Sequence, residues 1–157
     1  MQRWEQCLFN LFHGVVAVTG LVYLTMKYAM TPIDPFAVIN HPWQPVMLSV
    51  HVVAAPVFIA VFGMIFRSHT LSKLLSPRPD NRRSGWTALL SFSAMALSGY
   101  LLQVVSSPAW LTGLVWAHVS TSLIFVAGYG MHLVVGWRLS QVAREASGIA
   151  REARVRP

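Results

Sequence analysis

Residues 117–137 read AHVSTSLIFVAGYGMHLVVGW, an apolar run that contains no aspartate, glutamate, lysine or arginine and ends at Trp137. It has the length of about 20 residues that a helix needs to cross the hydrocarbon core of a bilayer. It nevertheless carries two histidines, His118 and His132, 14 residues apart. Ionisable side chains are rare and costly inside a membrane, so they usually serve a function there. The stretch therefore predicts a membrane helix that contributes to a site.

The composition of the whole chain supports a membrane protein. Of its 157 residues, 55% are hydrophobic and 11% are charged, whereas soluble domains have about a quarter charged residues. The single cysteine, Cys7, excludes an intrachain disulfide, and it excludes an iron–sulfur cluster or zinc ribbon built from this chain alone. The net charge of +7 does not suggest a nucleic-acid partner, because the basic residues lie between and after the apolar runs.

Four apolar stretches are long enough to span a membrane, and together they predict an all-α integral membrane protein. The fold we expect is a four-helix transmembrane bundle over residues 1–140, followed by a basic tail over 141–157. In the tail two ARE units are visible, and no larger internal repeat is evident. The predicted spans are approximately 8–29, 45–67, 86–106 and 112–137.

The basic residues fall almost entirely on one side of this topology. Lys27 is the single exception among the 12 lysines and arginines. Because cytoplasmic loops of membrane proteins are enriched in lysine and arginine, both termini and the middle loop are predicted to be cytoplasmic, in a bacterial inner membrane. Segment 30–44 then faces outward, with Trp43 in the aromatic belt. The basic residues on the cytoplasmic side are Arg3, Arg67, Lys73, Arg78, Arg82, Arg83, Arg138, Arg144, Arg151, Arg154 and Arg156.

Four of the six histidines fall inside the predicted spans, and they form two pairs by depth. His13 and His132 each lie about five residues from the cytoplasmic end of their span. His51 and His118 each lie about six residues from the outer end. The remaining two, His41 and His69, lie outside the spans and are interpreted as interfacial.

The 14-residue interval between His118 and His132 gives this pairing a chemical meaning. It corresponds to about 21 Å along a helix and to nearly four full turns, so both side chains leave the helix on almost the same face. One helix can thus supply a ligand to each of two stacked cofactors, and haem iron accepts axial imidazoles. The pattern predicts two b-type haems, one held by His13 and His132, the other by His51 and His118. The alternative is that these histidines make polar contacts between helices or form a proton relay.

Small residues beside these histidines are the further candidates for contact with a haem. Gly20 follows His13 on the same helical face, and Gly99 lies in the third span. Lys27 reaches the outer level, where it would meet a haem propionate or anchor the helix at the interface. Such small residues also pack membrane helices together without any cofactor.

The four spans, the order His13, His51, His118, His132, and the sequence HLVVGW at 132–137 resemble the cytochrome b subunits of membrane-bound formate dehydrogenases. The nickel–iron hydrogenase cytochrome b subunits are similar. The resemblance covers residues 1 to about 140, and it implies the same histidine pairing. It also implies electron transfer through two haems between a periplasmic iron–sulfur subunit and a quinone site near the cytoplasmic haem.

Two features depart from the resemblance. Lys27 stands where the formate dehydrogenase type has a glycine, and the segment SPRPDNRRSGW at 76–86 lacks a recognisable quinone-contacting motif. Asn10, one turn before His13, is the remaining candidate for a bond to a quinone carbonyl.

The expected function is that of a di-haem b subunit of a respiratory oxidoreductase, without catalytic residues of its own. It would exchange electrons with a periplasmic iron–sulfur or c-type cytochrome subunit attached to a catalytic subunit, and with menaquinone or ubiquinone in the surrounding lipid. Two alternatives remain open at the level of sequence. One is a haem-free membrane anchor or assembly subunit, and the other is a b-haem redox or oxygen sensor.

Overall fold

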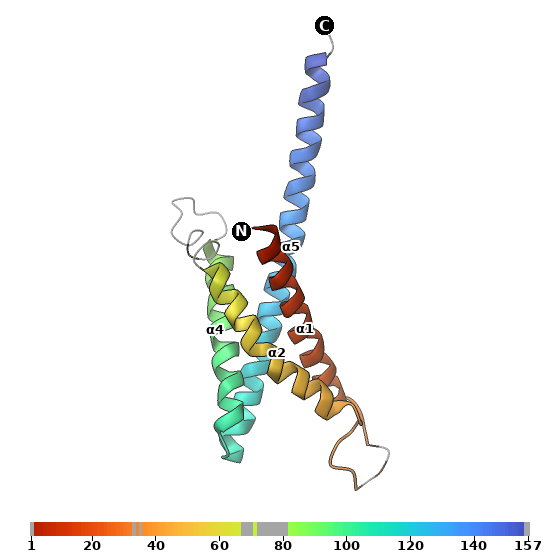
Figure 1. The fold of residues 1–157 in the computed structure, drawn as a ribbon, viewed down its shortest axis with the longest axis vertical. Coiled ribbons are helices and arrows are strands. Elements are labelled where there is room, and N and C mark those ends of the chain that lie inside the picture. The colour runs from red at the N-terminus through yellow and green to blue at the C-terminus, as the bar shows by residue number, and fades with distance from the viewer. Residues whose placement is uncertain (1, 33, 35, 67–70, 72–81, 156–157) are drawn as a thin grey trace. The chain divides into compact units, whose positions relative to one another are not determined.

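The computed structural model describes residues 2–32, 34, 36–66, 71 and 82–155. Within these residues four long helices follow one another, namely α1 (Arg3–Tyr28), α2 (Gln44–Ile65), α4 (Arg82–Val104) and α5 (Pro108–Val155) (Figure 1). No strand occurs among the described residues. Each helix contains a segment long and apolar enough to cross a membrane, so the predicted all-helical class with four candidate spans is confirmed.

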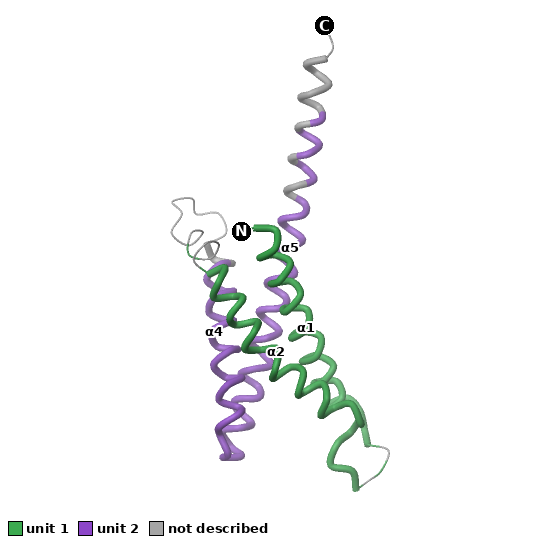
Figure 2. Tube along the Cα trace, in the orientation of Figure 1, with its two compact units in different colours: residues 1–80 green, residues 81–157 purple. Residues whose placement is uncertain are grey.

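The chain divides into two units, residues 1–80 and residues 81–157 (Figure 2). The first unit is a hairpin of α1 and α2, and the second is a hairpin of α4 and α5. The joining of the two hairpins into one four-helix bundle stays a prediction. The predicted interfacial residue His69 and the basic residues Arg67, Lys73 and Arg78 of the middle loop lie outside the described residues.

Helix α1 begins before the predicted apolar run because polar residues cap it. The carboxylate of Glu5 accepts a hydrogen bond of 2.6 Å from the backbone N–H of Gln2, which lies just before the first helical residue. An acidic residue in the first turn and Lys27 in the last turn both suit the helix dipole. The helix ends at Tyr28, and the N–H of Ala29 still donates to Thr25 O at 2.9 Å.

The connection between α1 and α2 is fastened by one asparagine. The side-chain amide of Asn40 donates to Lys27 O and to Met30 O, both at 2.9 Å, and so satisfies carbonyl groups at the end of α1. The backbone N–H of the same residue donates to the side chain of Gln44, the first residue of α2, at 3.2 Å. Asn40 therefore fixes how far α2 is displaced along α1.

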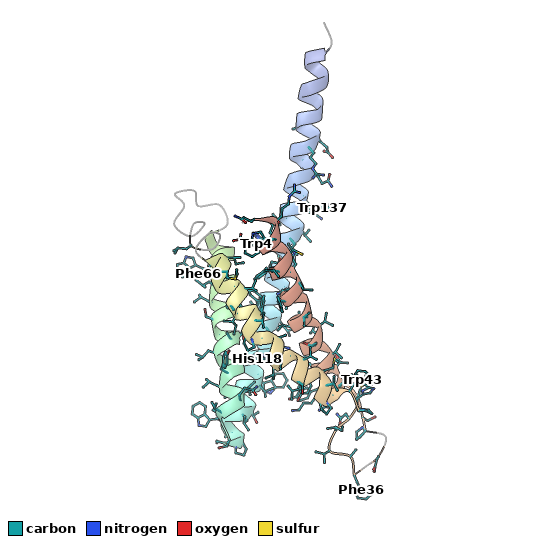
Figure 3. All side chains as sticks on the ribbon, in the orientation of Figure 1. Trp4, Phe36, Trp43, Phe66, His118 and Trp137 are labelled. Carbon is teal, nitrogen blue, oxygen red and sulfur yellow. The ribbon has the colours of Figure 1, made fainter. Side chains whose placement is uncertain are left out.

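Trp43 and Phe66 flank the two ends of helix α2 (Figure 3). Pro45 lies in its first turn, where the missing N–H costs nothing. Pro56 lies in the middle, and the helix continues through it. Proline is tolerated in membrane helices because neighbouring groups satisfy the carbonyl that it leaves.

The second hairpin turns within three residues, 105–107, and Pro108 begins α5. Helix α5 is 48 residues long, about 72 Å, which is more than twice the hydrocarbon thickness of a bilayer. Its apolar part ends at Arg138. The part of the predicted tail that lies between residues 141 and 155 belongs to the same helix, because α5 continues without a break to Val155. The segment LSQVAREA over 139–146 is composed mostly of good helix formers, which explains the continuity.

The apolar surface of both hairpins is largely exposed. Val18 is 59% exposed on α1 and Val53 73% exposed on α2, while Leu97 on α4 and Met131 on α5 are exposed to a similar degree. Exposed apolar surface on this scale is unusual for a soluble protein. It is the surface expected of helices that face lipid.

Candidate functional site

His51 projects from α2 onto the backbone of α1. Its Nδ1 atom lies 2.9 Å from Val16 O and 3.3 Å from Thr19 Oγ1. A carbonyl oxygen can only accept a hydrogen bond, so Nδ1 must carry the proton. In a neutral imidazole the lone pair then resides on Nε2, and Nε2 is the atom with which His51 would bind a metal. We call Val16, Thr19 and Gly20 the His51 cradle.

His118 projects from α5 onto α4 in the same way. Its Nδ1 atom lies 2.9 Å from Met95 O and 3.3 Å from Ser98 Oγ. The same reasoning places the proton on Nδ1 and the ligand lone pair on Nε2. We call Met95, Ser98 and Gly99 the His118 cradle.

A glycine allows each imidazole to lie directly on the neighbouring helix. A Cβ atom added to Gly20 would lie 2.9 Å from His51 Cε1, and one added to Gly99 would lie 3.0 Å from His118 Cε1. Real Cβ atoms rarely approach a neighbour so closely, so any larger residue would displace the ring. Gly20 and Gly99 were predicted from the sequence to contact a haem, and in the structure their neighbours are the imidazoles.

A second set of contacts lies farther along each hairpin. The ring of His13 packs against Phe58, with centroids 5.7 Å apart and planes inclined by 59°. In the other hairpin, Phe92 packs against Phe125 at 5.4 Å and 57°. Phe92 is thus the counterpart of His13. His13 also stacks on Phe9 at 6.0 Å, which further restricts its ring.

These contacts reveal an internal repeat. Positions in α1 recur 79 residues later in α4, as Thr19 and Ser98 show, and positions in α2 recur 67 residues later in α5, as His51 and His118 show. The two offsets differ by 12 because the first hairpin has a 15-residue connection, 29–43, and the second has three residues, 105–107.

The repeat was missed in the sequence, where no repeat beyond the tail was expected. Its signal is short and degenerate. VAVTG at 16–20 corresponds to MALSG at 95–99, and both His51 and His118 are followed by a valine and, seven residues on, by a phenylalanine. Different connection lengths shift the two halves against each other, so that no single period aligns them.

The other two histidines of the spans break the repeat. His13 corresponds to Phe92, and His132 corresponds to Ile65, which is buried. His13 lies beside Phe58, one seven-residue step from His51, whereas His132 lies two such steps beyond His118. At 1.5 Å per residue these steps are about 10 Å and about 21 Å along the helices.

The remaining predicted residues lie away from the cradles. Lys27 Nζ donates a hydrogen bond of 3.4 Å to the hydroxyl of Tyr23. The same nitrogen lies over the rings of Tyr23 and Tyr28 at the end of α1. Asn10 is exposed on α1, one turn before His13. His41 Nδ1 accepts a hydrogen bond of 3.2 Å from the N–H of Trp43 and so helps to form the turn before α2.

The donor set of each cradle is a single imidazole. Within the described residues, no three histidine, cysteine, aspartate or glutamate side chains gather as metal ligands. Each cradle instead offers one neutral imidazole of fixed tautomer, which is what haem iron accepts on each axial face.

Comparison of the chain with protein families, with curated proteins and with solved structures gave no match. Its function is therefore inferred from its own residues.

Proposed function

We propose that this chain is a di-haem b membrane subunit of a respiratory oxidoreductase in a bacterial inner membrane. It passes electrons between a periplasmic redox partner and the quinone pool. One observation carries the proposal: two hairpins of different sequence hold a histidine in the same orientation, with Nδ1–H given to a backbone carbonyl at 2.9 Å. Histidines that ligate metals nearly always donate their second ring N–H in this manner.

His51 and His118 would hold one haem through their Nε2 atoms. The carbonyls of Val16 and Met95 fix the tautomer and the ring orientation of these ligands, so little conformational freedom is lost on binding. A haem iron with two axial imidazoles accepts and releases single electrons. In the predicted topology His51 is near the outer end of its span, so this haem would exchange electrons with the periplasmic iron–sulfur or c-type cytochrome subunit.

His13 and His132 bind the second haem, on the cytoplasmic side. The pairing rests on the predicted topology, in which both histidines lie about five residues from the cytoplasmic end of their span.

Single histidine substitutions test the ligand assignment. His51→Ala and His118→Ala should each lose the same haem, about half of the total, and His13→Ala and His132→Ala should each lose the other. His41→Ala is the matched control, because His41 lies outside the helices and should leave both haems in place. The measurement is haem per chain by pyridine haemochrome, with redox titration to identify the haem that remains.

The partition of the haems decides the outcome. If His51→Ala and His118→Ala removed haems of different potential, the two cradles would not share a haem. If all four variants kept the full haem content, the membrane histidines would not be ligands.

The quinone would bind near the cytoplasmic haem, where Asn10 is the candidate for a hydrogen bond to its carbonyl. Asn10 is exposed on α1 and one turn from His13. Asn10→Leu should slow the reduction of haem by added quinol severalfold without changing haem content, because a hydrogen bond to a buried carbonyl contributes about 1 kcal/mol. An unchanged rate would exclude Asn10 from the quinone site.

A further inference from the structure

The hydroxyls of Thr19 and Ser98 each contact both a backbone carbonyl of their own helix and an imidazole of the neighbouring helix. Each donates a hydrogen bond of 2.7 Å to the carbonyl four residues earlier, Val15 O for Thr19 and Ala94 O for Ser98. A hydroxyl has one proton and two lone pairs. Once its proton is committed to the helix backbone, its oxygen faces the imidazole as an acceptor.

The Nδ1–H of each histidine is therefore shared between two oxygens. In this bifurcated hydrogen bond the carbonyl oxygen lies 2.9 Å from Nδ1 and the hydroxyl oxygen lies 3.3 Å from it. Both hydroxyl residues are buried, with Thr19 8% exposed and Ser98 6% exposed. Hydrogen bonds are electrostatically stronger in such an environment than in water, so the longer hydrogen bond to the hydroxyl oxygen also affects the imidazole.

Helix packing alone does not account for this pair of hydroxyls. Thr25 in α1 and Ser93 in α4 make the same bond to the carbonyl four residues earlier, each at 2.9 Å, on exposed surface. Thr19 and Ser98 differ from them in touching an imidazole, and they do so at equivalent positions of the two hairpins. The recurrence of a hydroxyl at this position indicates a role toward the histidine.

We propose that Thr19 and Ser98 are positioning residues for the two axial ligands of one haem, and that their hydroxyl oxygens lower its reduction potential. The inference rests on the proposed function. An acceptor at Nδ1–H increases electron density on the imidazole and makes Nε2 a more basic ligand. A more basic ligand stabilises oxidised iron more than reduced iron, because the oxidised form carries the greater positive charge.

The test is a redox titration of the purified full chain with both haems bound. Thr19→Val keeps the shape of the side chain and removes the hydroxyl, and Ser98→Ala removes one oxygen atom. Each should shift one of the two midpoint potentials upward and leave the other in place, with haem content unchanged. Both should shift the same potential, and the double variant should shift it further than either single variant.

Two kinds of control accompany the titration. Thr25→Val and Ser93→Ala remove a hydroxyl with the same backbone bond and should shift neither potential. Thr19→Ser and Ser98→Thr retain the hydroxyl and should restore the original potential. Because the two positions test the claim independently, Ser98→Ala decides it if Thr19→Val does not retain haem, and the converse holds.

Three results would overturn the inference. They are potentials that do not move, a downward shift, or shifts by Thr19→Val and Ser98→Ala in different haems. A wild-type chain that holds no haem would instead overturn the proposed function, so the two failures are distinguishable.

Discussion

At the scale of single residues, the chemistry of the site follows from which ring nitrogen carries a proton. Val16 O and Met95 O fix that proton on Nδ1 of His51 and of His118. The carbonyls can approach because Gly20 and Gly99 leave room for the rings. A backbone acceptor cannot be removed by substituting its own side chain, so the glycines are the residues through which this arrangement can be disturbed.

Gly20→Ala and Gly99→Ala should destabilise the haem-bound protein. The added methyl group would meet His51 or His118 at about 3 Å, and overpacking of this kind typically costs about 1–3 kcal/mol. Thermal unfolding followed through the haem absorbance should show a lower midpoint and a smaller haem content. Gly63→Ala and Gly113→Ala are matched controls, because nothing lies within 4 Å of their added Cβ.

The controls should move in the opposite direction. Glycine in the middle of a helix is about 0.5–1 kcal/mol less favourable than alanine, so Gly63→Ala and Gly113→Ala should be neutral or slightly stabilising. If Gly20→Ala behaved as Gly63→Ala does, the close approach of His51 to α1 would not exist in the folded protein.

At the scale of helices and hairpins, the two hairpins form an internal repeat. In each hairpin the second helix contributes a histidine and, seven residues later, a phenylalanine, and the first helix contributes a small hydroxyl residue followed by glycine. The two hairpins differ at the other two histidines, because His13 corresponds to Phe92 and His132 corresponds to Ile65. The positions of His51 and His118 are thus equivalent in the two hairpins, whereas those of His13 and His132 are not.

The sequence predicts local features well and contacts between helices poorly. The four spans follow from apolar runs, and the common face of His118 and His132 follows from the helical period. The contact of His51 with Val16 joins residues 35 positions apart, and it depends on the displacement of α2 along α1 that Asn40 sets. No local pattern encodes that displacement, so neither the cradles nor the repeat could be predicted.

The length of α5 could have been predicted more closely. The apolar run ends at Trp137, and this suggested a boundary there. Helix α5 continues because backbone hydrogen bonding depends on helix propensity and not on hydropathy, and residues 139–146 include no glycine or proline. A change from lipid to water along a helix leaves its backbone geometry intact.

At the scale of the whole molecule, the orientation of the chain in the membrane decides which side each histidine is near. The charge distribution predicts cytoplasmic termini, and in that topology His51 and His118 would be nearer the periplasmic surface. The single cysteine offers a direct probe, because Cys7 is exposed near the start of α1.

A membrane-impermeant maleimide should label Cys7 only after the membrane is opened. The matched variant carries Cys7→Ser and Ser107→Cys, which moves the thiol to the turn between α4 and α5. That variant should be labelled in intact spheroplasts. Labelling of Cys7 in intact spheroplasts would reverse the topology and assign the His51 and His118 level to the cytoplasmic side.

The haem content and the reduced-minus-oxidised spectrum of the purified wild-type chain from haem-replete cells test the proposed function. Two b-type haems per chain are expected, both low-spin, because each would be held by two imidazoles. One haem per chain would restrict ligation to one level of histidines, and a colourless protein would contradict the account and leave a haem-free membrane anchor.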